Sequence, residues 1–406
     1  MTTSPPSVIA AAPRRRRARR TMGRLLSTGC VMGAAIMIAS IHQRGDAQTA
    51  FQGTGSLTSG DAFIQQGSAP NTDTILVNSS SMIDWDVNIP TPTGSYDFLP
   101  ADRTVNFVSS SGSDYTILNR INVSSGATPL LNQIIELNGT IRSTVGGVPG
   151  GNVWFYTPGG FLVGGTATID VGGLVLSTSQ IDPTSSFDGS NGSLHFTGLA
   201  ANAPAGSTVR IASGASISAG NYVVMVAPRI EQSGTVGSDG NIVYIAAEAA
   251  DITISNGLFD IVVPTNGGTG DANGIVHDGT TTGGASTGFS DVQRIYMAAV
   301  PKNQAMTMLL SGTIGYTPAA SAINDGSGVI LSAGYDISGG DAIVSSGGLG
   351  TGSATIAIGA STLNNATSVS ALNGISLTAG QNEAIDARSS LSLRAGDGFN
   401  AGTISV

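Results

Sequence analysis

The side chains that could carry catalytic chemistry in this sequence are few and widely spaced. Asp84 and Asp86 occupy alternate positions of a strand-like run, so both carboxylates would face one side of a strand. Paired carboxylates can cleave glycosidic bonds, with one acting as the acid and the other as the base or nucleophile. We interpret this pair as part of an outward polar face and keep a polysaccharide lyase or hydrolase as an alternative function.

Other catalytic patterns do not stand out. The histidines beyond residue 47 are His195 and His277, and no spacing of serine, histidine and aspartate suggests a catalytic triad. No group of metal-ligating residues is apparent, and with 57 glycines a chance glycine motif does not indicate phosphate binding. The sequence therefore predicts a protein that is not an enzyme and that needs no cofactor or metal.

A Gly/Thr-rich segment at 261–290 is the best candidate for a small binding site. It contains Asp271, His277 and Asp278 among glycines and threonines. Its spacing does not match the calcium-binding repeat G-G-x-G-x-D, because Asp271 comes one position too early after the glycines. We expect a solvated loop that interrupts the regular structure.

Short strands are the elements that must position these residues. Residues 119–180 alternate short apolar runs with corners of Gly, Asn and Pro. Asn138-Gly139 is a strong turn dipeptide, because both residue types tolerate a positive φ. The run at 153–156 is rich in β-forming residues and stops at the corner 157–160. Strands this short, with corners this close, indicate a β-solenoid.

An internal repeat supports the solenoid. The run at 220–227 is echoed at 240–247, an offset of 20 residues that is about the length of one β-helix coil. Hydrophobic residues make up 40% of the chain against 11% charged residues, and they occur in strand-sized runs that can bury a long core. The sequence predicts an all-β, right-handed parallel β-helix that continues through open-ended coils at 291–406.

Residues 1–47 have the pattern of a signal peptide with an extended basic n-region. A block of arginines precedes an apolar stretch at 25–41, and small residues favour cleavage between Ala47 and Gln48. The apolar stretch is short for a membrane-spanning helix, which needs about 20 apolar residues. A membrane anchor is the alternative, whereas lipidation at Cys30 is disfavoured because apolar sequence continues beyond it.

Removal of this leader makes the chain strongly acidic. The leader takes eight of the 17 basic residues and one of the 26 acidic residues, which leaves nine basic and 25 acidic residues and a net charge of −16. This charge argues against nucleic acid or an anionic membrane surface as a partner. Cys30 is the only cysteine, so an exported chain without the leader must be held by regular packing and backbone hydrogen bonds.

Residues 48–118 are predicted to form an N-terminal cap. Strand-like runs at 74–77, 82–85 and 105–107 are separated by a Pro-rich loop. Without a cap, the first coil of a solenoid would expose an unpaired edge. We expect Trp85 to pack inside this cap.

The chain also resembles the two-partner-secretion domain of filamentous-haemagglutinin-type exoproteins, with the core of the domain at 119–260. The order and spacing of several short motifs carry the resemblance, including a turn that reads Asn-Pro-Asn-Gly in the family. Here Thr157 and Gly159 replace the two asparagines of that turn. The matching residues, which the resemblance makes a secretion motif, are Asn119, Arg120, Asn138, Gly139, Pro158 and Gly160.

This resemblance implies an adhesin of a Gram-negative bacterium that crosses the periplasm and the outer membrane to be secreted or held at the cell surface. Its N-terminal domain would direct export through a partner outer-membrane pore that carries polypeptide-transport-associated domains. The exported protein would bind a ligand on a host or neighbouring cell. Arg120 would either anchor a corner through carbonyl groups or touch the transporter. The N-terminal passenger part of a self-transporting adhesin is the other alternative.

Overall fold

The computed structural model describes most of the chain beyond the predicted leader. Met1–Asp46 and Ala47–Val406 form separate units, and all described residues belong to the second. Cys30 and Ala47 lie outside the described residues, whereas Gln48 is the first of them. The described ranges are 48–92, 94–185, 192–255, 258–264, 266–284, 293–302, 306–316, 328–338, 341–342, 354–364, 366–371, 374–378, 385–386, 392–395 and 403–405.

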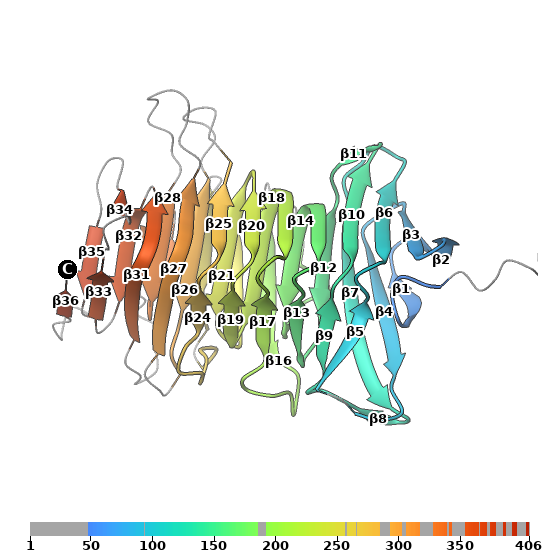
Figure 1. Cartoon of the computed structure of the whole chain (residues 1–406), viewed down its shortest axis with the longest axis horizontal. Helices are drawn as coiled ribbons and strands as arrows, with labels where there is room; N and C mark the ends of the chain where they lie inside the picture. The colour runs from blue at the N-terminus through green and yellow to red at the C-terminus, as the bar shows by residue number, and fades with distance from the viewer. Residues whose placement is uncertain are drawn as a thin grey trace, which may run out of the picture. The chain divides into compact units, whose positions relative to one another are not determined.

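The second unit is a parallel β-helix with three faces. Every described element is a strand, and strands of successive coils pair in parallel, one behind the other along the axis (Figure 1). Antiparallel strands close its N-terminal end. The predicted fold class, an all-β parallel β-helix with an N-terminal β cap, is confirmed.

Each face is a ladder of parallel strands, and the long strands bend from one face to the next. Face 1 consists of β3 (Thr72–Val77), β6 (Thr104–Ser109), β10 (Thr140–Val145), the first parts of β14 (Thr168–Ser177) and β18 (Ser216–Ala227), β20 (Thr235–Ser238), β25 (Thr280–Gly283), the last parts of β27 (Met306–Tyr316) and β31 (Ala354–Asn364), and β34 (Ile385–Asp386). Face 2 consists of β4 (Ser81–Asn88), β7 (Thr116–Ser125), β12 (Asn152–Tyr156), the last parts of β14 and β18, β21 (Asn241–Ala246), β26 (Arg294–Ala299), β28 (Gly328–Ala333), β32 (Ala366–Ala371) and β35 (Ser392–Ala395). Face 3 consists of β5 (Ser95–Leu99), β9 (Ile134–Leu137), β13 (Gly160–Val163), β17 (Thr208–Ile211), β19 (Arg229–Gln232), β24 (Ile275–His277), the first parts of β27 and β31, β33 (Gly374–Thr378) and β36 (Thr403–Ser405).

Two hairpins leave the coils near the N-terminal end. β8 (Thr128–Pro129) returns antiparallel along the end of β7, and β11 (Val148–Pro149) returns along the end of β10. Figure 1 shows them projecting on opposite sides of the helix. Gly126 and Gly146 supply the positive φ that such tight reversals need.

Alternating burial sets the register between coils. In the sequence repeat, Val223 pairs with Ile242 and Met225 with Tyr244, and all four side chains point into the main core. The offset is therefore 19 residues rather than the predicted 20. An offset of 20 would match Val223 with Val243, which points outward into a second core, because a shift of one residue reverses the direction of every side chain.

Aromatic side chains close the N-terminal end. β1 (Thr54–Ser59) pairs antiparallel with β4, and β2 (Ala62–Ala69) pairs antiparallel with β3. The ring centroid of Phe51 lies 4.8 Å from that of Trp85 and 4.6 Å from that of Phe98. Buried Asp73 accepts hydrogen bonds from the backbone N–H groups of Ala50 (3.0 Å) and Phe51 (2.8 Å), which holds the segment in place.

This end structure is shorter than the predicted cap. β3 already pairs in parallel with β6, and β4 pairs in parallel with β7. Regular coils therefore begin near Thr72, inside the range 48–118 that the sequence assigned to the cap. The reason is that a coil needs only apolar alternation and a parallel neighbour, and β3 already has both.

A second sheet covers the outer side of face 2, which the sequence analysis did not predict. Its strands pair antiparallel in the order β15 (Ser179–Ile181), β16 (Ser193–Leu199), β22 (Ala250–Ser255), β23 (Leu258–Val262), β29 (Ile337–Ser338) and β30 (Asp341–Ala342). Leu194 and Phe196 pack with outward residues of face 2, such as Val224 and Val243, in a second hydrophobic core. The last parts of β18 and β21 are covered on both sides, and their sequences are therefore continuous apolar runs.

The predicted loop at 261–290 contains regular coil. β24 and β25 lie within it and pair in parallel with strands of the coils before and after. His277 is 1% exposed, so the expectation of a solvated histidine is wrong. Its position at the end of β24, rather than the polar composition around it, decides its burial.

Buried His277 is held in its neutral form. Nδ1 donates to the Ser311 carbonyl (2.7 Å), so Nε2 can accept from the Thr281 hydroxyl (2.9 Å). The Tyr244 hydroxyl lies 3.0 Å from Thr281 Oγ1 and extends this chain. Burial lowers the pKa of His277 from its ordinary value of 6.5, because a charged imidazolium would lose its solvation.

We expect this histidine to make the fold sensitive to acid. Above pH 6.5 His277 is neutral in both states, whereas below pH 6.5 the unfolded chain takes up the proton first. Stability is therefore lost as the pH falls from 6.5 through the lowered folded-state pKa, by up to about 1.4 kcal/mol per pH unit. Urea unfolding between pH 8 and pH 5 measures the loss. His277→Gln should remove this component, whereas His195→Gln, at a partly exposed position, should retain it. Equal profiles for both variants would contradict the assignment.

Candidate functional site

Asn119, the first residue of the resemblance, points into the helix. In face 2 it lies in register between Ile83 on β4 and Phe155 on β12, in a row of otherwise apolar side chains. It is fully buried, and its amide is satisfied: Oδ1 accepts from Trp85 Nε1 (3.0 Å), and Nδ2 donates to the Trp154 carbonyl (3.2 Å). Asn119 therefore ties the aromatic end structure to the next two coils.

Arg120, the next residue, points outward and pairs with a carboxylate. Its Nε donates to Asp84 Oδ1 at 2.6 Å and its Nη2 to Asp84 Oδ2 at 2.8 Å, a bidentate pair across two neighbouring strands. The expectation that Arg120 bonds to corner carbonyls is thus not met. Asp84 and Asp86 do lie on one side of β4, as predicted, but Arg120 neutralises Asp84, so they are not two free carboxylates.

The Asn138-Gly139 corner is built by close contact rather than by a positive φ. Neither residue takes a positive φ. A Cβ on Gly139 would lie 2.4 Å from the Arg103 carbonyl oxygen, so only glycine fits beneath the preceding coil. The Asn138 amide donates to Asp97 (3.0 Å) and Glu136 (3.2 Å) on the neighbouring strands. The corner joins face 3 to face 1.

The corner with Pro158 and Gly160 also depends on close packing of coils. Gly160 has a φ of +120°, and a Cβ there would lie 2.7 Å from the Thr208 carbonyl oxygen. A Cβ on Gly159 would lie 2.1 Å from the Gln133 carbonyl oxygen, which explains why a glycine stands at this position. Thr157 is buried and donates its N–H to the Ser177 carbonyl (3.2 Å).

The six motif residues do not converge on one binding site. Asn119 and Arg120 are neighbours on face 2, whereas the two corners lie at different edges of the helix. Apart from Pro158, their shared property is that each one connects a coil to the next through a hydrogen bond, an ion pair or a close glycine contact.

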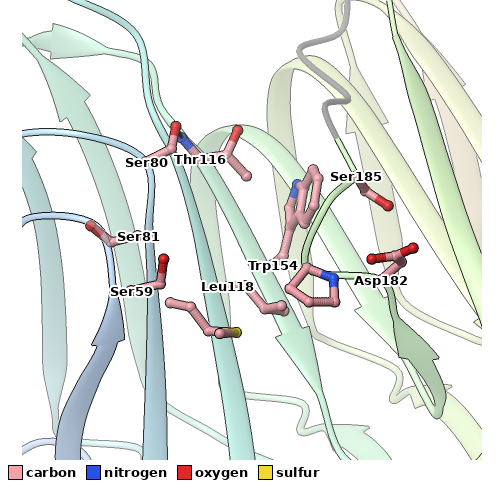
Figure 2. Close-up of a pocket in the computed structure, with 10 residues that line it drawn as sticks. Ser59, Ser80, Ser81, Thr116, Leu118, Trp154, Asp182 and Ser185 are labelled. Carbon is pink, nitrogen blue, oxygen red and sulfur yellow. Dashed lines mark hydrogen bonds between the residues drawn. The ribbon is translucent and has the colours of Figure 1, made fainter.

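A hollow lies on the outer side of face 2, beside the edge strand β15. Two adjoining hollows of about 400 Å³ and 310 Å³ share Leu118, Asp182 and Pro183, and we call them together the β15 groove. Figure 2 shows Leu118 and Trp154 between a wall of serines on one side and Asp182 and Ser185 on the other. The second hollow extends past Arg120 to Thr197.

Two polar groups define the electrostatics of the β15 groove. Asp182 Oδ1 accepts from the Thr184 backbone N–H and hydroxyl, both at 2.8 Å, and these bonds lower the pKa of the carboxyl. Burial raises the pKa of Tyr156, partly offset by its hydrogen bond with Gln180 and by the charge of Arg120. At neutral pH the β15 groove thus contains a fixed negative charge and a neutral phenol.

One constellation escaped the sequence analysis. Ser193 Oγ lies 3.1 Å from His195 Nε2, and His195 Nδ1 lies 2.7 Å from Asp251 Oδ1. Ser193 and His195 both lie on β16, and the pairing of β16 with β22 brings Asp251 beside His195 across a separation of 56 residues that no local spacing reveals. The side chains of His195 and Asp251 are 43% and 46% exposed, and neither hollow of the β15 groove includes any of the three.

Among the described residues, no three His, Cys, Asp or Glu side chains are arranged to hold a metal ion. The same part of the chain contains no apolar helix long enough to span a membrane.

The role of Asn119 can be measured directly. Asn119→Ala leaves the Trp85 indole N–H and the Trp154 carbonyl without their partner, which we expect to cost about 2–3 kcal/mol of unfolding free energy. Asn122→Ala is the matched control, because Asn122 is exposed on the same strand. Urea unfolding should show a large shift for Asn119→Ala and almost none for Asn122→Ala. Equal midpoints for both variants would refute the structural role.

Comparison with known proteins identifies the family. The model of the TPS secretion domain matches residues 39–304, more than half of the chain. No curated protein sequence matches significantly. Among solved structures, the HMW1 secretion domain from Haemophilus influenzae is similar at 17% identity and a TM-score of 0.46, over 87% of this chain and 83% of that one. The filamentous hemagglutinin secretion domain is similar at 14% identity and a TM-score of 0.33, over 88% of this chain and 100% of that one.

The family match confirms the resemblance that the corner and strand motifs indicated. The closed N-terminal end, the glycine-dependent corners and the coils as far as β26 lie within the matched residues. The chain belongs to the TPS secretion domain family, whose domains direct the export of secreted proteins across the outer membrane through a partner transporter.

Proposed function

We propose that this chain is an adhesin of a Gram-negative bacterium, exported through an outer-membrane pore with polypeptide-transport-associated domains. Membership in the TPS secretion domain family is the observation that carries this proposal. The leader 1–47 would take the chain to the periplasm and be cleaved between Ala47 and Gln48. Outside the cell the β-helix would present a surface to a ligand on a host or neighbouring cell.

The physical properties of the chain suit such a route. Beyond the leader it has no cysteine, so no disulfide can lock it before it reaches the pore. Its net charge of −16 without the leader favours solubility in the unfolded state. Each coil buries its inward side chains on the coil before it, so folding outside the cell can proceed coil by coil and favour forward movement.

The motif residues would serve secretion through this folding step. Asn119 ties the closed end to the first coils, and the corners at Gly139 and Gly160 allow successive coils to approach closely. A chain that cannot form these first coils lacks the template on which later coils add. We therefore propose that the secretion motif acts in initiation of the β-helix and not as a single contact surface.

Export can be tested in cells that produce the chain with or without the partner pore. We expect the full chain in the medium only when the pore is present, and deletion of residues 119–180 should abolish its appearance there. Truncation of residues 345–406 is a control of equal length outside the matched region, and it should leave export intact. Export without the pore, or after deletion of 119–180, would refute the proposal.

Adhesion needs its own measurement. The protein purified from the medium should bind to cells in a saturable manner, and an excess of unlabelled protein should compete. If it instead shortened polysaccharide chains in solution, the alternative of a lyase or hydrolase would replace the adhesin.

A further inference from the structure

We propose that the β15 groove binds an extended, positively charged segment of another protein, which adds to the edge of the second sheet as a further strand. The binding would be distinct from export and from the adhesive surface as a whole. The groove lies between a sheet edge and an apolar floor, and this position is the observation behind the proposal.

The second sheet ends one strand short of covering face 2. Met82, Leu118, Trp154 and Val175 are consecutive members of one outward row, in parallel register. Leu118, Trp154 and Val175 lie in the second core, whereas Met82 is only partly buried at its border. Among the described strands β15 pairs only with β16, so its other edge faces this gap. A strand added at β15 would continue the sheet over Leu118 and Met82.

The dimensions of the groove fit a strand. Thr116, Leu118 and Arg120 point outward from alternate positions of β7 and line the floor, over a length of about 13 Å at about 3.3 Å per residue. The two hollows lie one after the other along this floor, with Leu118 common to both. Alternate side chains of an added strand would therefore enter successive hollows, which is how sheet-edge binding gains specificity.

The charges favour a basic occupant. Asp182 borders both hollows, and its carboxylate stays ionised because the Thr184 hydrogen bonds favour the charged form. Arg120 does not offset this charge, since it is already paired with Asp84. The chain carries a net charge of −16 without its leader, so a second copy would be repelled. A lysine or arginine of the occupant would lie beside Asp182.

A sugar ligand fits the groove less well than a peptide. Binding of a sugar ring usually needs an exposed aromatic face, and Trp154 is only 3% exposed. Its indole Nε1 already donates to the Tyr222 hydroxyl at 2.9 Å. The floor therefore offers aliphatic contact at Met82, beside the edge of the second sheet at Ile181.

Binding of a fluorescein-labelled peptide of sequence Lys-Val-Lys-Val-Lys-Val to the purified protein is measured by fluorescence anisotropy at low ionic strength. We expect saturable binding that weakens about tenfold or more for Glu-Val-Glu-Val-Glu-Val, because like charges would meet at Asp182. Lys-Val-Lys-Pro-Lys-Val should also bind poorly, because proline removes a backbone donor and disfavours a paired strand.

Variants of the protein locate the site. Thr197→Arg places bulk and a like charge in the second hollow and should abolish binding, whereas Thr253→Arg, at an exposed position of the same sheet, should not change it. Asp182→Asn should weaken binding about fivefold, the size expected for one exposed charge pair. Asp170→Asn removes an exposed carboxylate on face 1 and should have no effect. Circular dichroism checks that each variant is folded.

Three results would overturn the proposal. No saturable binding of the lysine peptide would remove it entirely. Equal binding to the Thr197→Arg and Thr253→Arg variants would place any binding elsewhere on the acidic surface. Equal affinity of the proline peptide would show that the segment does not bind as an added strand.

Discussion

The alternation of side chains along paired parallel strands is the constraint on which the rest of this structure depends. Once Val223 pairs with Ile242, every inward position of the coil meets an inward position of the next. A slip of one residue would turn a whole apolar row to the solvent, so one register is strongly preferred. The corners must then keep the coils at strand spacing, which explains why Gly139 and Gly160 leave no room for a side chain.

A solenoid has two weak places, its open end and any apolar outer face, and this protein covers both with extra strands. Phe51, fixed by Asp73, packs against the aromatic residues of the first coils, while β1 and β2 occupy the first edges. The antiparallel second sheet covers the outer apolar row of face 2. The β15 groove lies at the edge where the second sheet ends, so it results from the way this sheet covers face 2.

Buried polar side chains fix the alignment of neighbouring coils at particular positions of this regular stack. Asn119 and His277 both lie inside the helix, and both have their hydrogen-bonding groups satisfied by the backbone or by neighbouring side chains. Apolar rows could in principle exchange places between coils at moderate cost, whereas a misplaced amide or imidazole would lose its partners. These residues help to select one alignment, which suits a protein that must fold reliably after passage through a pore.

The sequence by itself determined the fold class and the family, because short apolar runs, Gly and Asn corners and motif order are local and repeat along the chain. It also indicated that Trp85 packs at the N-terminal end, which the structure confirms. Only the tertiary structure decided that Arg120 pairs with Asp84, that His277 is buried, and that the second sheet forms the β15 groove. These features depend on contacts between residues dozens of positions apart, and those contacts follow from the register of whole coils and from strand pairings that no local pattern specifies.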